Sequence, residues 1–137
     1  MREILFRGKG THGHKTGKWV YGNYAKDFWG KDRGGFSILP FDGGCYEVDP
    51  ETVGQYTGLT DKNENKIFEG DIIVVYINGY KTICQVAWAS NVAQFQLWQT
   101  NTIPHTPTAL NLGNYDCEVI GNIHDNPELL ESEVQGE

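Results

Sequence analysis

Four acidic residues at predicted turns are the side chains of this sequence that could do hydrolytic chemistry: Asp49, Glu51, Asp61 and Asp71. Acid–base hydrolysis needs two carboxyl groups in one site. An acid at a turn can equally bind the backbone amides beside it, as Asp49 before Pro50 is suited to do. No spacing pairs these carboxylates. We therefore rank a hydrolase last among the functions and predict that the protein is not an enzyme.

One acidic segment imitates a calcium-binding loop. Asp61, Asn63 and Asn65 stand at the first, third and fifth ligand positions of such a loop. Lys66 then replaces the glycine of the sharp turn, and Ile72 replaces the closing glutamate. The polar tip of a β-hairpin explains the same residues without a metal, and we favour that interpretation.

A second segment imitates a phosphate-binding loop. Gly8, Gly13, Lys15 and Thr16 nearly match the required spacing, but His14 is inserted between the second glycine and the lysine. An aromatic, β-prone segment follows, where a phosphate loop needs the N-terminus of a helix. We interpret residues 8–17 as a mobile loop at a strand junction.

Histidines and cysteines are the remaining residues that could bind metals or act as nucleophiles. His12 and His14 would point the same way on an extended chain, but no Cys or carboxylate lies close by in sequence, so solvated side chains are favoured over a metal pair. Cys45, Cys84 and Cys117 are widely spaced and read as reduced, buried thiols, with a Cys nucleophile left open. We predict no metal and no cofactor, and leave an ion at His12, at His14 or at the acidic turns open.

The N-terminal third combines basic and aromatic residues. Residues 1–34 hold eight basic and three acidic residues, a charge of +5. Residues 35–137 hold three basic and fifteen acidic residues, a charge of −12, which gives a net charge of −7 for the whole sequence. Aromatics interleaved with cations are used to bind single-stranded nucleic acid. The competing interpretation, core aromatics with solvated charges, is favoured by the acidic remainder. The candidate nucleic-acid residues are Lys18, Trp19, Tyr21, Lys26, Trp29, Lys31 and Arg33.

Short strands must position these residues. Hydrophobic alternation and turn residues predict strands near 1–7, 19–28, 36–39, 45–48, 52–56, 72–77, 80–88, 94–99 and 117–124. Asn78 and Gly79 predict a tight hairpin, and Pro127 suits the first position of a helix. The pattern favours an all-β (mainly β) fold, namely a small SH3-like or partly open barrel with additional N-terminal strands and one short C-terminal helix.

The length of 137 residues fits one domain. We predict a single domain over residues 1–130, with 1–47 as a candidate N-terminal β subdomain and 48–125 as the barrel core. Residues 131–137 form a predicted acidic tail. A long irregular connection at 101–115 is of a length that is usually functional or mobile.

Three parts of the sequence carry a family resemblance: Met1–Arg7, Val48–Ile73 and Val119–Leu130. They resemble the YopX-like family of phage and prophage proteins. The loop at 8–17 is less typical of this pattern, and nothing is carried over to it. The residues that we take as a structural signature are Asp49, Pro50, Gly54, Tyr56, Gly58, Gly70, Asp71, Gly121, Asn122 and Pro127.

The resemblance implies a small, mostly β protein encoded by a phage or prophage and acting in the cytoplasm of the bacterial host. It implies no biochemical activity and supplies no catalytic residues. The longest aliphatic run, Ile72–Ile77, is far too short to cross a bilayer, so we expect neither a transmembrane helix nor a signal peptide.

The sequence is consistent with two non-enzymatic functions. The first is a non-enzymatic protein-interaction module that self-associates into a homo-oligomer and contacts a phage or host protein, as Trp29, Trp98 and the long loop suggest. The alternative is single-stranded nucleic-acid binding through the N-terminal third. No membrane partner is expected.

Overall fold

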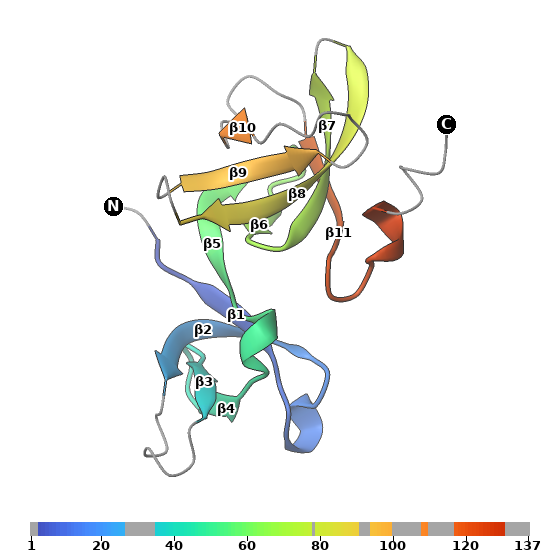
Figure 1. Cartoon of the computed structure of the whole chain (residues 1–137). Helices are drawn as coiled ribbons and strands as arrows, with labels where there is room; N and C mark the ends of the chain where they lie inside the picture. Colours follow the sequence, from blue (N-terminus) through green and yellow to red (C-terminus); the bar gives the residue numbers. More distant parts are fainter. Residues whose placement is uncertain are drawn as a thin grey trace. The chain divides into compact units, whose positions relative to one another are not determined.

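The computed structural model describes residues 3–26, 35–77, 79–90, 94–99, 108–109 and 117–130. In these ranges the chain forms β-strands β1 to β11, two 3-10 helices and a short helical segment at 128–130 (Figure 1). The assigned strand pairs are antiparallel. The all-β prediction, with one short helix near the C-terminal end, is confirmed. Trp29, Lys31, Arg33, the 131–137 tail and most of the 101–115 connection lie outside the described residues.

The chain divides into two compact units, Met1–Tyr56 and Thr57–Glu137, here called the N-terminal unit and the C-terminal unit. The boundary falls inside β5 (Gly54–Thr60), so this strand contributes to both units. No strand pairing joins the outermost described strands of either sheet, and the sheets are therefore open rather than closed into a barrel.

The N-terminal unit is a meander whose strands lie in the order β4-β3-β2-β1-β5. Its elements are β1 (Phe6–Lys9), the 3-10 helix η1 (Gly13–Lys15), β2 (Trp19–Lys26), β3 (Phe36–Leu39), β4 (Tyr46–Glu47), the 3-10 helix η2 (Pro50–Thr52) and the first residues of β5. Val20, Ile38 and Val48 form the buried core. Side chains alternate across a strand, so the residues on either side of Val20, Trp19 and Tyr21, point to the opposite face.

The C-terminal unit is built on a second sheet in the order β10-β9-β8-β7-β11, with β6 paired to the last residues of β5. Register shifts between Val119 and Gly121, where a bulge interrupts the pairing of β11 with β7. The strands are β6 (Lys66–Phe68), β7 (Asp71–Ile77), β8 (Tyr80–Ala89), β9 (Gln94–Gln99), β10 (Thr108–Ala109) and β11 (Cys117–Asn122).

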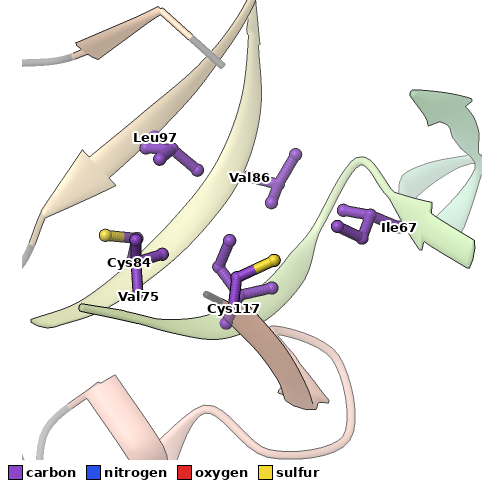
Figure 2. Close-up of a cluster of buried hydrophobic side chains, with 7 residues drawn as sticks. Ile67, Val75, Cys84, Val86, Leu97 and Cys117 are labelled. Carbon is purple, nitrogen blue, oxygen red and sulfur yellow. The ribbon is translucent and has the colours of Figure 1, made fainter. Parts of the chain in front are cut away.

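Alternation along β7 places apolar side chains on both faces of this sheet. Ile73 and Val75 belong to one buried cluster, whereas Ile72 and Val74 belong to another that packs against Leu129 and its neighbours near the helical segment. Both faces are therefore covered, which explains the unbroken aliphatic run. Figure 2 shows the first cluster, with side chains gathered from β6, β7, β8, β9 and β11: Ile67, Val75, Cys84, Val86, Leu97 and Cys117.

Candidate binding cleft in the N-terminal unit

The outer face of β2 presents two aromatic rings beside the cations of β1. Trp19 pairs with Lys9 across the antiparallel ladder, and Tyr21 pairs with Arg7. The Arg7 guanidinium carbon lies 4.5 Å from the centroid of the Trp19 ring, and the Lys9 ammonium lies 5.5 Å from it. Positive charge at this distance from an indole face is a favourable cation–π geometry.

Tyr46 on β4 adds a third ring at the edge of this surface, because it pairs with Ile38 and also packs against the buried cluster of Val20, Ile38 and Val48. The turn before it is closed by a hydrogen bond from the Gly43 amide to the Pro40 carbonyl, at 3.1 Å. Gly44 has φ +94, and a Cβ there would lie only 3.0 Å from the Tyr46 ring. A side chain at Gly44 would therefore be strained and would press on this ring.

The 3-10 helix η1 places Lys15 over Tyr46. The Lys15 ammonium lies 5.2 Å from the Tyr46 ring centroid, and the His14 ring meets the same ring edge-on at 6.1 Å. The Gly17 amide donates to the Gly10 carbonyl and the Gly10 amide to the Lys18 carbonyl, both at 2.9 Å. The loop predicted at 8–17 is wrong in its first residues, because Gly8 and Lys9 belong to β1. Residues 10–18 form a hydrogen-bonded turn that holds Lys15 in place.

These groups surround an open cleft of about 430 Å³, here called the aromatic cleft. This volume lies in the range typical of small-ligand sites. The lining combines aromatic, apolar and cationic side chains with one carboxylate: Lys15, Trp19, Val20, Tyr21, Pro40, Asp42, Gly43 and Tyr46. It can stack a planar group and neutralise negative charge beside it.

The predicted nucleic-acid residues are only partly brought together. Trp19 and Tyr21 line the cleft. Lys18 is exposed next to Trp19, whereas Lys26 lies at the other end of β2 with its ammonium 5.9 Å from the Phe36 ring centroid. Trp29, Lys31 and Arg33 fall outside the described residues.

Tyr24 shows that part of the aromatic run is core. Its ring stacks on Phe36 with centroids 6.1 Å apart and lies 5.6 Å from Phe6. Trp19 and Tyr21 are on the opposite face, and Tyr21 is 46% exposed. Sequence reasoning missed Tyr46 and Asp42 as partners of these rings, because β3 brings them there and no local spacing connects them with β2.

Three of the four carboxylates that could have supported hydrolysis accept backbone amides, and the fourth, Glu51, is exposed. Asp49 caps η2 by accepting from the Glu51 amide at 3.0 Å. Asp71 is buried and accepts from the Phe68 amide at 2.8 Å. Asp61 accepts from the amides of two nearby turn residues and of one residue on β11. These three act as structural acceptors, and none of the four lines the aromatic cleft.

The histidine and cysteine candidates are likewise accounted for by local contacts. His12 Nδ1 lies 2.8 Å from Thr11 Oγ1 and 3.5 Å from Glu47 Oε1. Within the described residues, no three His, Cys, Asp or Glu side chains gather as a metal-binding group. Cys84 and Cys117 are buried, and burial raises the pKa of the Cys84 thiol to about 12. A thiol in that state is a poor nucleophile.

The sequence matches the model of a known protein family. A model of the YopX protein family matches residues 15–131, which include β2 and all eight residues that line the aromatic cleft. The chain belongs to the YopX family. No curated protein matches it. Among solved structures, the crystal structure of protein EF1440 from Enterococcus faecalis is similar, with 24% sequence identity, a TM-score of 0.49 and coverage of 95% of this chain and 99% of that one.

Several signature residues of this YopX-family chain occupy positions with a backbone requirement. Gly58 and Gly70 have φ of 92° and 93°. A Cβ on Gly121 would collide with Asn126 Oδ1 at 2.6 Å. Asn122 Oδ1 accepts from the amides of His124 and Asp125.

The remaining signature residues lie at element ends or in pairings. Pro50 opens η2, Gly54 pairs with Arg7, and the Tyr56 amide donates to the Leu5 carbonyl at 2.8 Å. Pro127 precedes the helical segment, and its carbonyl accepts from the Leu130 amide at 3.2 Å. No helix among the described residues of this YopX-family chain is long and apolar enough to span a membrane.

Proposed function

We propose that this YopX-family protein is a non-enzymatic binding module, encoded by a phage or prophage and working in the host cytoplasm, and that its aromatic cleft binds single-stranded nucleic acid. The observation that carries the proposal is the convergence of three rings with Lys15 in one open cleft. A base stacked on an aromatic side chain contributes about 1–3 kcal/mol.

The cations beside the rings suit the phosphates of such a ligand. Lys15 lies over Tyr46 and lines the cleft, and Lys9 lies over Trp19. Arg7 also lies over Trp19 but is only 6% exposed, so it supports this ring and is not a phosphate contact. The Lys15 ammonium, which lines the cleft, can contact the phosphate that follows a base stacked in it. The same contacts disfavour a cationic ligand, because the protein's own cations lie over these rings.

The distribution of charge confines this role to the N-terminal unit. Residues 1–56 contain eight basic and seven acidic residues (+1), and residues 57–137 contain three and eleven (−8). The C-terminal unit therefore repels phosphate, and the few cations at the cleft predict only a shallow decrease of affinity as salt rises. We expect an affinity set by stacking rather than by net charge.

Fluorescence anisotropy of a labelled single-stranded oligothymidine at low ionic strength tests the proposal. Wild-type protein should bind saturably, and Tyr21→Ala should weaken binding by about tenfold, as expected for one lost stacking contact. Tyr76→Ala is the matched control, since Tyr76 on β7 is 47% exposed against 46% for Tyr21. The absence of saturable binding, or equal losses in the two variants, would refute the proposal.

A second candidate function is self-association through the C-terminal unit. Trp88 on β8 is 44% exposed and packs edge-on against Phe95 at 4.9 Å, and Tyr76 and Ile120 are also exposed. Trp98 is half-buried, and its indole N–H donates to Gln96 Oε1 at 3.1 Å. Trp88 is thus the better candidate for a contact between copies, and sedimentation of wild type and Trp88→Ser would show an oligomer lost on substitution. A monomeric wild type would exclude it.

A further inference from the structure

Asp42 is the single acidic residue among the eight that line the aromatic cleft. It is exposed in the turn between β3 and β4, and its carboxylate has no hydrogen bond or ion pair with any residue that the structure describes. Asp49, Asp61 and Asp71 contrast with it, because each of them accepts a backbone amide. The described contacts of the fold therefore do not use this carboxylate, which lines the cleft.

A carboxylate is an unfavourable neighbour for phosphate. It subtracts from the positive potential that Lys15 and Lys9 supply and lowers non-specific affinity. An ionised carboxylate accepts hydrogen bonds and donates none. In a cleft that stacks bases, the donors that it can meet are the N–H groups on the edges of the bases.

The four kinds of base differ in those donors. Guanine offers its N1–H and an N2–H side by side, which matches the two oxygens of one carboxylate. Cytosine and adenine offer one amino group next to a ring nitrogen that accepts. Thymine and uracil offer a single N–H between two carbonyl oxygens, which repel the carboxylate.

We propose that Asp42 is the base-reading group of the aromatic cleft and that it selects guanine by accepting two parallel hydrogen bonds from N1–H and N2–H. The inference rests on the proposed nucleic-acid function and specifies its ligand. Paired charge-assisted hydrogen bonds add both energy and geometric specificity. The cleft then combines stacking by its rings, a phosphate contact by Lys15 and base selection by Asp42.

The test compares three single-stranded heptanucleotides of thymidine with a central guanine, hypoxanthine or thymine. Hypoxanthine differs from guanine only by the missing amino group. Wild-type protein should bind the guanine oligonucleotide about tenfold more tightly than the thymine one, the lower part of the range for a bidentate base contact, and the hypoxanthine oligonucleotide should lie between them.

Asp42→Asn should abolish the difference in affinity among the guanine, hypoxanthine and thymine oligonucleotides. Its affinity for the thymine oligonucleotide should be equal to that of wild type or stronger, because a negative charge is lost. Glu64→Gln, at an exposed turn of the C-terminal unit, removes the same charge elsewhere and should keep the guanine preference. Thermal melts confirm that both variants fold. Equal affinity of wild type for all three oligonucleotides, or a guanine preference that survives in Asp42→Asn, overturns the inference but leaves the proposed function standing. Failure to bind any of them refutes both.

Discussion

The carboxylate of Asp61 accepts a hydrogen bond from the backbone amide of Val119 at 3.0 Å, across 58 positions of the sequence. The same carboxylate accepts from the amides of Asn63 and Asn65, at 2.9 and 2.8 Å. A single buried anion therefore joins the turn after β5 to β11. Burial alone would raise the pKa of the Asp61 carboxyl, but these hydrogen bonds outweigh it and hold the pKa below the ordinary 3.8.

Replacing Asp61 with asparagine should lower the free energy of unfolding by about 2 kcal/mol. The asparagine amide can face only some of these donors, and a hydrogen bond to a charged group contributes about 1.5–3 kcal/mol. Urea unfolding followed by tryptophan fluorescence measures the change. Glu64→Gln alters an exposed residue of the same turn with the same change in charge and should shift stability by less than about 0.5 kcal/mol. Equal stabilities of the two variants would contradict the role assigned to Asp61.

The contribution of Asp61 should also depend on pH. Its folded-state pKa is depressed, so the stabilisation is fully present above the unfolded value near 3.8 and is lost as pH falls through the folded value. The difference in unfolding free energy between wild type and Asp61→Asn should therefore be constant from about pH 7 to pH 5 and shrink below about pH 4. A difference that persists unchanged to about pH 2 would be inconsistent with a depressed pKa.

Asp61 also shows where sequence reasoning stops. Local patterns predicted the strands and the polar turn, because alternation and turn residues act over a few positions. No sequence pattern near Asp61 indicates that its distant partner is the Val119 amide on β11. Without that partner, the polar residues of the turn also resembled a calcium-binding loop. The aromatic cleft has the same origin: Trp19 and Tyr21 could be named from composition, but Tyr46 and Asp42 join them only through the pairing of β2 with β3 and β3 with β4.

Gly70→Val should destabilise the fold strongly. Gly70 has φ 93°, is buried, and donates its amide to the Val86 carbonyl at 2.8 Å. A β-branched residue in this conformation is strained by about 1–3 kcal/mol, to which crowding in a buried position adds. Gly58→Val, at φ 92°, should show the backbone strain with less crowding because Gly58 is exposed. Thermal melts compare the melting temperatures of both valine variants with that of Gly13→Asn, which changes a left-handed position with open space around it. Unchanged melting temperatures of both valine variants would show that these glycines are dispensable.

The three thiols should differ sharply in reactivity. Cys84 and Cys117 are buried and Cys45 is half-buried. Burial raises the pKa of Cys84 to about 12, so this thiol stays protonated at neutral pH and has little thiolate to react. Ellman's reagent should titrate one thiol in the native protein and three in denaturant, and Cys45→Ser should leave the native protein unreactive. Rapid labelling of native Cys45→Ser would show that the core opens more readily than its packing implies.

The salt dependence of binding by Lys15→Gln distinguishes a phosphate contact at Lys15 from a general effect of charge. Each phosphate neutralised on a single strand changes the slope of log affinity against log salt by about 0.7, so Lys15→Gln should make the slope for oligothymidine shallower by about that amount. Lys81→Gln removes the same charge from an exposed position on β8 of the C-terminal unit and should leave the slope as it is. The ammonium of Lys15 lies 5.2 Å from the Tyr46 ring, so its loss acts where a stacked base would place the next phosphate. Equal changes in both variants would mean that only net charge is sensed, and the assignment of phosphate binding to the aromatic cleft would then fall.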